Sequence, residues 1–165
     1  MSYIETPRLI VRTWLFPADL TAAQALFTDP DVQRWYVRNA LTPQDVGAYV
    51  RALAGSEERD GFGIWPVVAK ESREVVGACG LAYVPDRSFV EVAWAFVPAA
   101  RGQGYAREAA AAVLTWAREH VPGAAIYALV DLDNAASVAL VNRLQMHFDG
   151  VVRLYRRDLL RYRVA

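Results

Sequence analysis

Cysteine, lysine and net charge are almost missing from this sequence of 165 residues. Cys79 is the only cysteine, which excludes an internal disulfide and a cysteine-based zinc site and suits a reducing compartment. Lys70 is the only lysine, so 17 of the 18 basic residues are arginine. Because 18 acidic residues balance them, the chain has no overall field that would draw it to nucleic acid or to an anionic membrane.

Long hydrophobic runs are missing as well, and no leader sequence is expected. No apolar run approaches the ~20 residues of a membrane span, and the first residues lack the basic and apolar regions of a signal peptide. We therefore expect a cytoplasmic protein. The chain is 55% hydrophobic and 22% charged, which is enough apolar material for one core and excludes a disordered chain. Its length predicts a single domain over residues 1–165.

The pattern of apolar residues predicts an α+β fold with a mixed, mostly antiparallel sheet and about four helices. Two predicted strands flank Glu71–Glu74, and a third follows after another short link. Short links between successive strands are typical of an antiparallel meander. Asp29–Asp31 is expected to end the first helix, and Thr42 with Pro43 to begin the second. Helices are predicted over 19–27 and 43–54, from the turn at 98–106 to about 120, and over 134–144. Strands are predicted over 9–14, 64–70, 75–84, 89–97, 124–130, 151–155 and 159–164.

A glycine-rich turn between a predicted strand and a predicted helix is the most informative segment. Gly102 and Gly104 lack a Cβ, so the backbone there can turn sharply and approach a ligand closely. The N–H groups of Gln103–Ala106 would lie in the first turn of the helix, where they have no intrahelical acceptor. With the positive helix end they form a site for an anion, and Arg101 and Arg107 could add charge at its rim. The alternative is an ordinary glycine turn that enters a core helix.

The segment Arg101–Ala106 resembles the Arg/Gln-x-x-Gly-x-Gly/Ala acetyl-CoA motif of the GNAT acetyltransferases. Other segments resemble the branch of this family that acetylates protein N-terminal amines, the ribosomal-protein-alanine N-acetyltransferases. They follow in that branch's order along nearly the whole chain: Thr6–Arg12, Val76–Gly77, Glu91–Trp94, and Asn134 with Ser137. The resemblance implies acetyl-CoA as co-substrate and a GNAT-like domain whose central strands splay apart to open a cleft.

The resemblance also implies roles for residues at the cleft. The pyrophosphate would bind the backbone N–H groups of residues 103–106, and the pantetheine arm would lie beside Phe96 and Val97 as a pseudo-strand. A backbone N–H near either residue is expected to hold the negative charge that develops on the thioester oxygen. Asn134 would contact the arm, and Ser137 would lie near the sulfur. The expected cofactor-binding residues are Phe96, Val97, Arg101, Gly102, Gln103, Gly104, Tyr105, Ala106 and Asn134.

Two positions depart from the family pattern. Many members carry a tyrosine seven residues after the asparagine, where it protonates the departing thiolate, and this chain has Val141 there. The usual Gly-Phe pair after that helix is replaced by Gln145 and Met146. Without the tyrosine, Ser137 is the nearest candidate for the general acid. The same departure leaves open a non-catalytic GNAT-like module that only holds CoA.

Glu91 is the candidate general base, since a carboxylate can take the proton of the acceptor amine directly or through water. It lies within an apolar strand, where a period of two places it on the face of Ala93 and Ala95. The alternative is a glutamate in solvent or paired with an arginine. Asp131 and Asp133 are weaker candidates that suit a turn or a helix cap.

Trp35, Tyr36 and Arg38 lie between the first two predicted helices, which line the acceptor pocket in GNAT folds. They are candidates for substrate binding, and packing of half-buried side chains is the alternative. The acceptor is expected to be a protein N-terminus or a small-molecule amine, and a homodimer is common among relatives. No metal site is expected, and neither nucleic acid nor a membrane is an expected partner. An interaction protein that binds RNA through the arginine-rich end at 153–163 is the further alternative.

Overall fold

The computed structural model describes residues 3–35, 40–84, 89–154 and 156–165, which form eight strands, five α-helices and one short 3₁₀ helix. The strands are β1 (Tyr3–Glu5), β2 (Leu9–Arg12), β3 (Ile64–Ala69), β4 (Val75–Tyr83), β5 (Val90–Phe96), β6 (Ile126–Asp131), β7 (His147–Leu154) and β8 (Arg157–Arg163). The helices are α1 (Leu20–Phe27), α2 (Pro30–Trp35), α3 (Pro43–Asp60), η1 (Pro98–Ala100), α4 (Tyr105–His120) and α5 (Ala135–Arg143). The predicted α+β fold class is confirmed.

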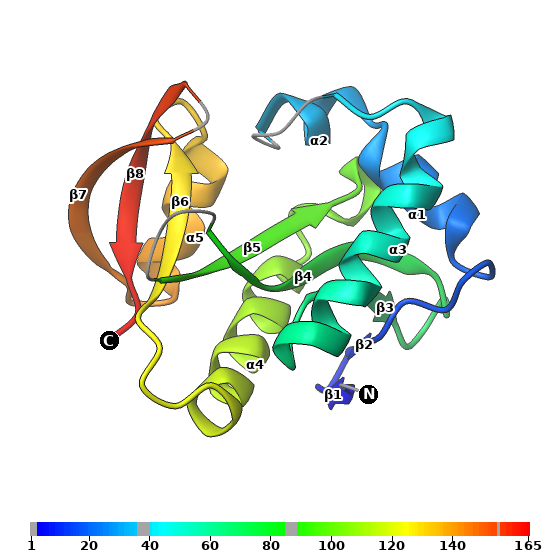
Figure 1. Ribbon diagram of the computed structural model, residues 1–165, viewed down its shortest axis with the longest axis horizontal. Coiled ribbons are helices and arrows are strands. Elements are labelled where there is room, and N and C mark those ends of the chain that lie inside the picture. The colour runs from blue at the N-terminus through cyan, green and yellow to red at the C-terminus, as the bar shows by residue number, and fades with distance from the viewer. Residues whose placement is uncertain (1–2, 36–39, 85–88, 155) are drawn as a thin grey trace.

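The strands form one sheet in the order β1-β2-β3-β4-β5-β6-β8-β7. All neighbouring pairs are antiparallel except β5 and β6, which are parallel. The predicted meander of β3, β4 and β5 is confirmed, and the two strands predicted near the end of the chain form the antiparallel pair β7 and β8. Two parallel neighbours need a crossover between them, which α4 supplies. Figure 1 shows β6, β7, β8 and α5 on one side of the molecule and α1 and α3 on the other.

The side chains of β5 serve two separate hydrophobic cores, because successive residues of a strand point to opposite faces. Val90 and Val92 belong to the core that is shared with α4. Ala93 and Ala95 face the second core, which contains side chains of α1 and α3. The α4 residues buried in the first core are Ala109, Ala110, Val113, Leu114 and Ala117.

The parallel pairing of β5 with β6 extends over only two residue pairs, Val90–Ile126 and Glu91–Tyr127. Beyond Glu91, β5 continues to Phe96 without a β6 partner among the described residues. β6 instead pairs with β8 along its length, from Tyr127 to Asp131. Since each strand follows a different neighbour, the two diverge, as Figure 1 shows. The expected splay of the central strands is confirmed.

Helix α2 is not among the predicted elements, because the Asp-Pro-Asp segment at its start was expected only to end α1. In the structure, Asp29 Oδ1 accepts hydrogen bonds from the N–H groups of Asp31 and Val32, each at 3.0 Å. Pro30 occupies the first helical position, which suits its fixed φ and its missing N–H. The segment therefore ends one helix and caps the next.

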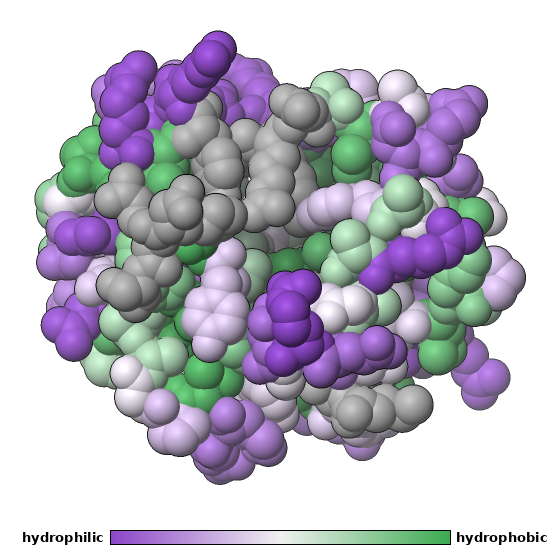
Figure 2. All heavy atoms as spheres, viewed as in Figure 1, coloured by the Kyte–Doolittle hydropathy of each residue, from purple (hydrophilic) through white to green (hydrophobic). Residues whose placement is uncertain are grey.

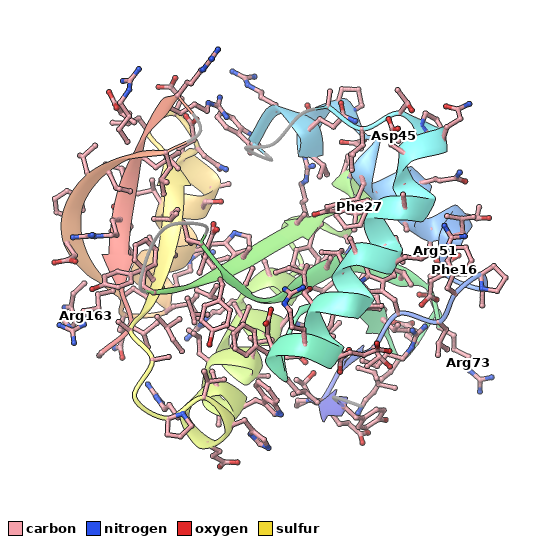
Figure 3. The ribbon with its side chains drawn as sticks, in the orientation of Figure 1. Phe16, Phe27, Asp45, Arg51, Arg73 and Arg163 are labelled. Atoms are coloured by element: carbon pink, nitrogen blue, oxygen red, sulfur yellow. The ribbon has the colours of Figure 1, made fainter. Side chains whose placement is uncertain are left out.

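Helix α3 begins at the predicted position and ends later than predicted. The Thr42 N–H donates to the Asp45 carboxylate at 2.9 Å, which satisfies a group at the start of the helix. The helix runs to Asp60 instead of residue 54 and ends at Gly61, whose φ of 78° is readily adopted only by glycine. The Arg51 guanidinium carbon lies 4.1 Å from the centroid of the Phe16 ring (Figure 3).

Two strand boundaries also differ from the prediction. The first predicted strand ends at Arg12, because Trp14 turns into the core beneath α1 and donates its indole N–H to the Ile64 carbonyl oxygen at 2.8 Å. Strand β7 begins at His147, four residues before the predicted 151. Its first three residues are all exposed, so they lack the alternation of apolar and polar side chains that predicts a strand. The short strand β1 was also not predicted.

Arginines near the end of the chain are paired with aspartates, so the arginine-rich segment does not form a continuous basic surface. The nitrogen–oxygen distances in these ion pairs are 2.9 Å for Arg153–Asp158, 3.1 Å for Arg157–Asp131 and 2.9 Å for Arg161–Asp149. Arg163 points outward from the end of β8 (Figure 3). This arrangement does not favour the RNA-binding alternative.

Among the described residues, no helix has the length and apolar character needed to cross a membrane.

Cys79 lies fully buried in the core shared with α4, in agreement with a packing role. Burial raises the pKa of its thiol to about 12, since a thiolate loses its hydration there. The thiol is therefore protonated at neutral pH and is a poor nucleophile.

A substitution at Gly80 tests how closely the backbone of β4 packs against Gly63 and the first residue of β3. A Cβ at this position would overlap the Gly63 carbonyl oxygen and come within 2.8 Å of the Ile64 Cα atom. Because both are backbone atoms, we expect Gly80→Ala to lower the free energy of unfolding by about 1–3 kcal/mol. Gly55→Ala is the matched control, since nothing lies within 4 Å of its added Cβ, and this helical position should gain about 0.5–1 kcal/mol. Urea denaturation of both variants measures the difference, and equal stability of the two would contradict the packing.

Candidate active site

The divergence of β5 from β6 opens a cleft with a volume of about 640 Å³. Strand β5 and the start of α4 line one part of it, α5 and β6 a second, and α2 and α3 a third. Figure 1 shows α2 near the mouth of the gap between β5 and β6. The same face is hollowed in Figure 2, with hydrophobic surface at the floor of the hollow.

The glycine turn before α4 has the geometry of an anion site. Gly102 and Gly104 have φ values of 76° and 81°, in the left-handed region that favours glycine. The first hydrogen bond of the helix runs from the Glu108 N–H to the Gly104 carbonyl oxygen at 3.1 Å. The three preceding N–H groups, those of residues 105–107, therefore have no intrahelical acceptor and carry the positive end of the helix dipole. Tyr105, Ala106 and Arg107 all line the cleft.

Gln103 is the one residue of the expected phosphate-binding turn that does not line the cleft. Its side-chain Nε2 donates to the Ala99 carbonyl oxygen at 2.9 Å, so the side chain closes the turn on itself. Its carbonyl oxygen accepts a hydrogen bond from Arg8 Nη1 at 2.8 Å. Gln103 therefore stabilises the conformation of the turn.

A pair of charged residues ties this turn to the first hairpin of the chain. Arg8 Nη2 lies 2.7 Å from Glu108 Oε2, and the Arg8 backbone N–H donates to Glu108 Oε1 at 2.9 Å. The Thr6 hydroxyl also donates to Glu108 Oε1, at 2.6 Å. The Arg8 guanidinium lies over the Tyr105 ring, 4.7 Å from its centroid. These contacts hold the start of α4 at a fixed place beside β2.

The surroundings of Glu108 favour its charged form over its protonated form, in spite of partial burial. Burial alone would raise the pKa of Glu108, but hydrogen bonds from Thr6 and Arg8 and the charge of Arg8 outweigh it. The net pKa therefore lies below its ordinary value. Glu108 also lies in the first turn of α4, where a negative charge interacts favourably with the helix dipole.

Arg101 connects the end of β5 to the acidic start of α2. Its Nε donates to the Phe96 carbonyl oxygen at 3.1 Å, and Nη1 donates to Asp31 Oδ2 at 3.2 Å. Asp29 lies at 3.9 Å from Nη2. Arg101 lines the cleft, and its guanidinium connects the wall formed by β5 to the wall formed by α2.

The open edge of β5 distinguishes Phe96 from Val97. The Val97 N–H donates to the Val76 carbonyl oxygen at 3.1 Å, on the side of β4, and Val97 is not among the residues that line the cleft. Successive residues of a strand direct their backbone groups to opposite edges, so those of Trp94 and Phe96 point to the β6 side. Past Glu91 no strand stands on that side in the described part of the chain. Of the two N–H groups expected to face the thioester, only that of Phe96 is directed into the cleft.

Ser137 is held at the opposite wall by two hydrogen bonds. Its backbone N–H donates to Asn134 Oδ1 at 3.1 Å, so the Asn134 side chain caps α5. The Trp94 indole N–H donates to Ser137 Oγ at 3.2 Å, across the gap between β5 and α5. Both Asn134 and Ser137 line the cleft. Val141, the position of the missing tyrosine, is fully buried in the core instead.

Glu91 lies at the point where β5 and β6 separate, and it lines the cleft as a half-buried side chain. The expected alternation is confirmed, since Ala93 and Ala95 face the core beneath α1 and α3. Asp131 also lines the cleft, and its Oδ2 lies 3.1 Å from Arg157 Nη2. The described lining of the cleft therefore contains three carboxylates, Asp31 from α2, Glu91 from β5 and Asp131 from β6.

The acceptor candidates are only partly covered by the structure. Trp35 lines the cleft from the end of α2, whereas Tyr36 and Arg38 lie outside the described residues. Tyr49 and Leu53, one turn apart on α3, line the same wall and were not predicted. Their spacing of four residues is the signal that would have shown a common face. No cluster of metal-ligating side chains occurs among the residues that the structure describes.

Comparison with known proteins identifies the family. The family model described as the acetyltransferase (GNAT) domain matches residues 8–147, so the chain belongs to the GNAT acetyltransferases. The uncharacterized N-acetyltransferase YjdG of Bacillus subtilis is 32% identical over 150 residues, covering 87% of this chain and 89% of that protein. The chain is thus a GNAT N-acetyltransferase, which confirms the family and the enzyme class expected from Arg101–Ala106.

Solved structures confirm the fold. An acetyltransferase from Agrobacterium tumefaciens superposes with a TM-score of 0.86 at 23% identity, covering 100% of this chain and 95% of that one. RimL, a ribosomal L7/L12 alpha-N-protein acetyltransferase solved in complex with coenzyme A, has a TM-score of 0.79 at 15% identity. That comparison covers 99% of this chain and 97% of RimL. The ribosomal-protein acetyltransferases expected from the sequence are therefore among the structural neighbours.

The Glu108 contacts predict a pH-dependent contribution to stability. Because its pKa is depressed in the folded protein, the carboxylate stabilises the fold above the ordinary value of about 4.3 and loses this effect as pH falls through the folded-state pKa. We expect Glu108→Gln to lower the free energy of unfolding by about 1 kcal/mol at pH 7, and the deficit to be smaller at pH 3.

Urea denaturation at both pH values measures this deficit. Glu119→Gln, an exposed change on the same helix, is the control and should leave stability unchanged. A Glu108→Gln deficit that stays constant between pH 7 and pH 3 would show that the charge of the carboxylate is not responsible.

Proposed function

We propose that this enzyme transfers the acetyl group of acetyl-CoA to a primary amine by direct attack of the amine in a ternary complex. The observation that carries the proposal is the cleft at the β5–β6 divergence. It combines the start of α4, the open edge of β5, Glu91 and Ser137 around one volume. The acetyl thioester supplies an already activated carbonyl, so the protein needs no covalent intermediate.

The fit of this chain to acetyl-CoA rests on backbone groups. The N–H groups of Tyr105, Ala106 and Arg107 would bind the pyrophosphate, with the positive end of α4 behind them. The outward backbone N–H and C=O groups of Trp94 would bind the amide groups of the pantetheine arm as a neighbouring strand does, which leaves the Phe96 N–H for the thioester oxygen. The side chain of Asn134 would contact the same arm from α5.

Glu91 would act as the general base. An alkyl ammonium has a pKa near 10 and an α-amino group one near 8, so a proton must be removed before either attacks at neutral pH. Glu91 would take that proton, directly or through a water molecule, at the end of the cleft nearest the intact β5–β6 pairs.

Phe96 and Ser137 would act on the thioester. The Phe96 N–H would donate to the oxygen that becomes negative during attack. Ser137 would pass its hydroxyl proton to the departing sulfur and take a proton back from water, so that the hydroxyl is restored. The hydrogen bond from Trp94 occupies a lone pair of Ser137 Oγ, so it orients the hydroxyl and leaves its proton available to donate.

Gly104 tests the phosphate-binding turn. Acetyl-CoA or CoA binds only the folded state and should raise the Tm of the wild type. We expect Gly104→Val to abolish this rise, because its side chain would crowd the backbone that faces the phosphates. Gly123→Val is the matched control, since Gly123 has nearly the same φ, 80° against 81°, and lies outside the cleft. An equal rise of Tm with CoA in both variants would contradict the assignment of the turn.

Glu91→Gln tests the base and the reaction together. The variant keeps the shape of the side chain and removes its basicity, so thiol release in the presence of an amine should fall by at least ~10²-fold near pH 7. The rate should recover partly as pH rises, because the neutral amine becomes abundant without the enzyme. CoA binding, followed by the rise of Tm, should be unchanged.

Asp131→Asn is the comparison for Glu91→Gln, since Asp131 is another carboxylate of the cleft and is paired with an arginine. It should lower the rate less than tenfold, with the fold verified by Tm. A larger loss in Asp131→Asn than in Glu91→Gln would move the role of base to Asp131. Wild-type rates in both variants across pH 6–9 would show that solvent, and neither carboxylate, takes the proton of the amine.

A further inference from the structure

The segment Thr6–Arg12 does not line the cleft, yet it contacts the glycine turn and the start of α4. The connection between β1 and β2 is closed by two hydrogen bonds. The Thr6 N–H donates to the Leu9 carbonyl oxygen at 3.0 Å, and the Leu9 N–H donates to Thr6 Oγ1 at 2.9 Å. Arg8 lies within this closed connection, so its backbone is held in place beside α4.

The Arg8 side chain joins three residues of the glycine turn and α4. Its Nη1 donates to the Gln103 carbonyl oxygen at 2.8 Å, and its Nε donates to Glu108 Oε2 at 2.7 Å. The guanidinium also lies over the Tyr105 ring, 4.7 Å from the centroid. Because a guanidinium is planar and its donors point in fixed directions, this one side chain fixes the three residues relative to each other.

The peptide bond between Gln103 and Gly104 is the part of the turn that most needs such support. Glycine adopts positive and negative φ about equally well, so this peptide could rotate and exchange the directions of its carbonyl and its N–H. In a trans peptide these two groups point in opposite directions. The bond from Arg8 holds the carbonyl oxygen on its own side, so the Gly104 N–H points away from Arg8. Gly104 lines the cleft and Arg8 does not.

The orientation of this peptide decides whether it attracts or repels a phosphate. An N–H directed at the cleft adds a donor to those of residues 105–107, and successive N–H groups of this kind form a concave anion site. A carbonyl oxygen in the same place would repel the anion.

We propose that Arg8 is a positioning residue for the phosphate site, which holds the Gly104 N–H toward the ligand and does not itself touch the ligand. This inference rests on the proposed function, because it assumes that the pyrophosphate of acetyl-CoA binds at the glycine turn. It also gives Thr6–Arg12 a role in ligand binding from outside the cleft.

Arg8→Lys tests the inference, because lysine keeps the positive charge beside Glu108 but has a single nitrogen, which cannot replace both Nε and Nη1. We expect the Kd of CoA, measured by calorimetry, to rise by at least ~10-fold, since a hydrogen bond from a charged donor to the turn is lost. KM for acetyl-CoA should rise with it, whereas kcat at saturating acetyl-CoA should change less than ~2-fold, because Arg8 touches no reacting group.

Lys70→Gln is the matched control. It removes the ion pair of Lys70 with Glu5, whose nitrogen–oxygen distance is 2.6 Å, from the same first hairpin, and Lys70 lies outside the cleft. It should leave the Kd of CoA unchanged. Arg8→Gln is the second variant, and it should weaken CoA binding at least as much as Arg8→Lys. The Tm of each free protein sets a temperature at which all are folded.

The outcomes separate this inference from the proposed function. Equal Kd values for CoA in the wild type and both Arg8 variants would overturn the positioning role and leave the proposed acetyl transfer standing. Unchanged Kd in Arg8→Lys with a rise only in Arg8→Gln would show that the charge acts through space, which also overturns it. So would a lower kcat at unchanged Kd, or an equal rise of Kd in Lys70→Gln. If CoA did not bind the wild type, the phosphate site of the proposed function would fail, and this inference with it.

Discussion

The early end of the β5–β6 ladder is the constraint on which the site depends. If the two strands paired along their whole length, the outward backbone groups of Trp94 and Phe96 would be hydrogen-bonded to β6. Because the last pair is Glu91–Tyr127, those groups face a cleft instead. The same divergence separates α5 from β5 far enough for a ligand, and the Trp94–Ser137 hydrogen bond still connects the two walls. An opening of this kind presents the backbone groups of β5 directly to a ligand.

Local patterns in the sequence predict the features that depend on neighbouring residues. The glycine spacing in Arg101–Ala106 predicts the sharp turn and the start of α4, because positive φ values and a free helix end are local properties. The period of two in β5 predicts the face on which Glu91 lies. Helix α2 carries a local signal as well, since the Asp29 side chain and Pro30 cap it. That signal was interpreted only as the end of α1, and the two interpretations are compatible.

Contacts between residues distant in the chain were not predictable in the same way. Arg8 and Glu108 are 100 positions apart, and Trp94 and Ser137 are 43 apart. Neither pair has a spacing that any periodicity encodes, and each depends on which strands become neighbours. The pair Phe96 and Val97 could not be separated from sequence either. Which of two adjacent N–H groups faces the cleft follows from the register with β4, and register is a tertiary property.

Hydrogen–deuterium exchange with and without CoA tests most directly whether the open edge of β5 and the start of α4 bind the ligand. CoA should slow exchange in the segments that contain Trp94 and Phe96 and in residues 105–107, because these N–H groups have no partner strand or intrahelical acceptor in the described structure. Exchange in β7, which is the strand at the far edge of the sheet, should not change. Protection confined to β7, or unchanged exchange in β5 at saturating CoA, would contradict the account.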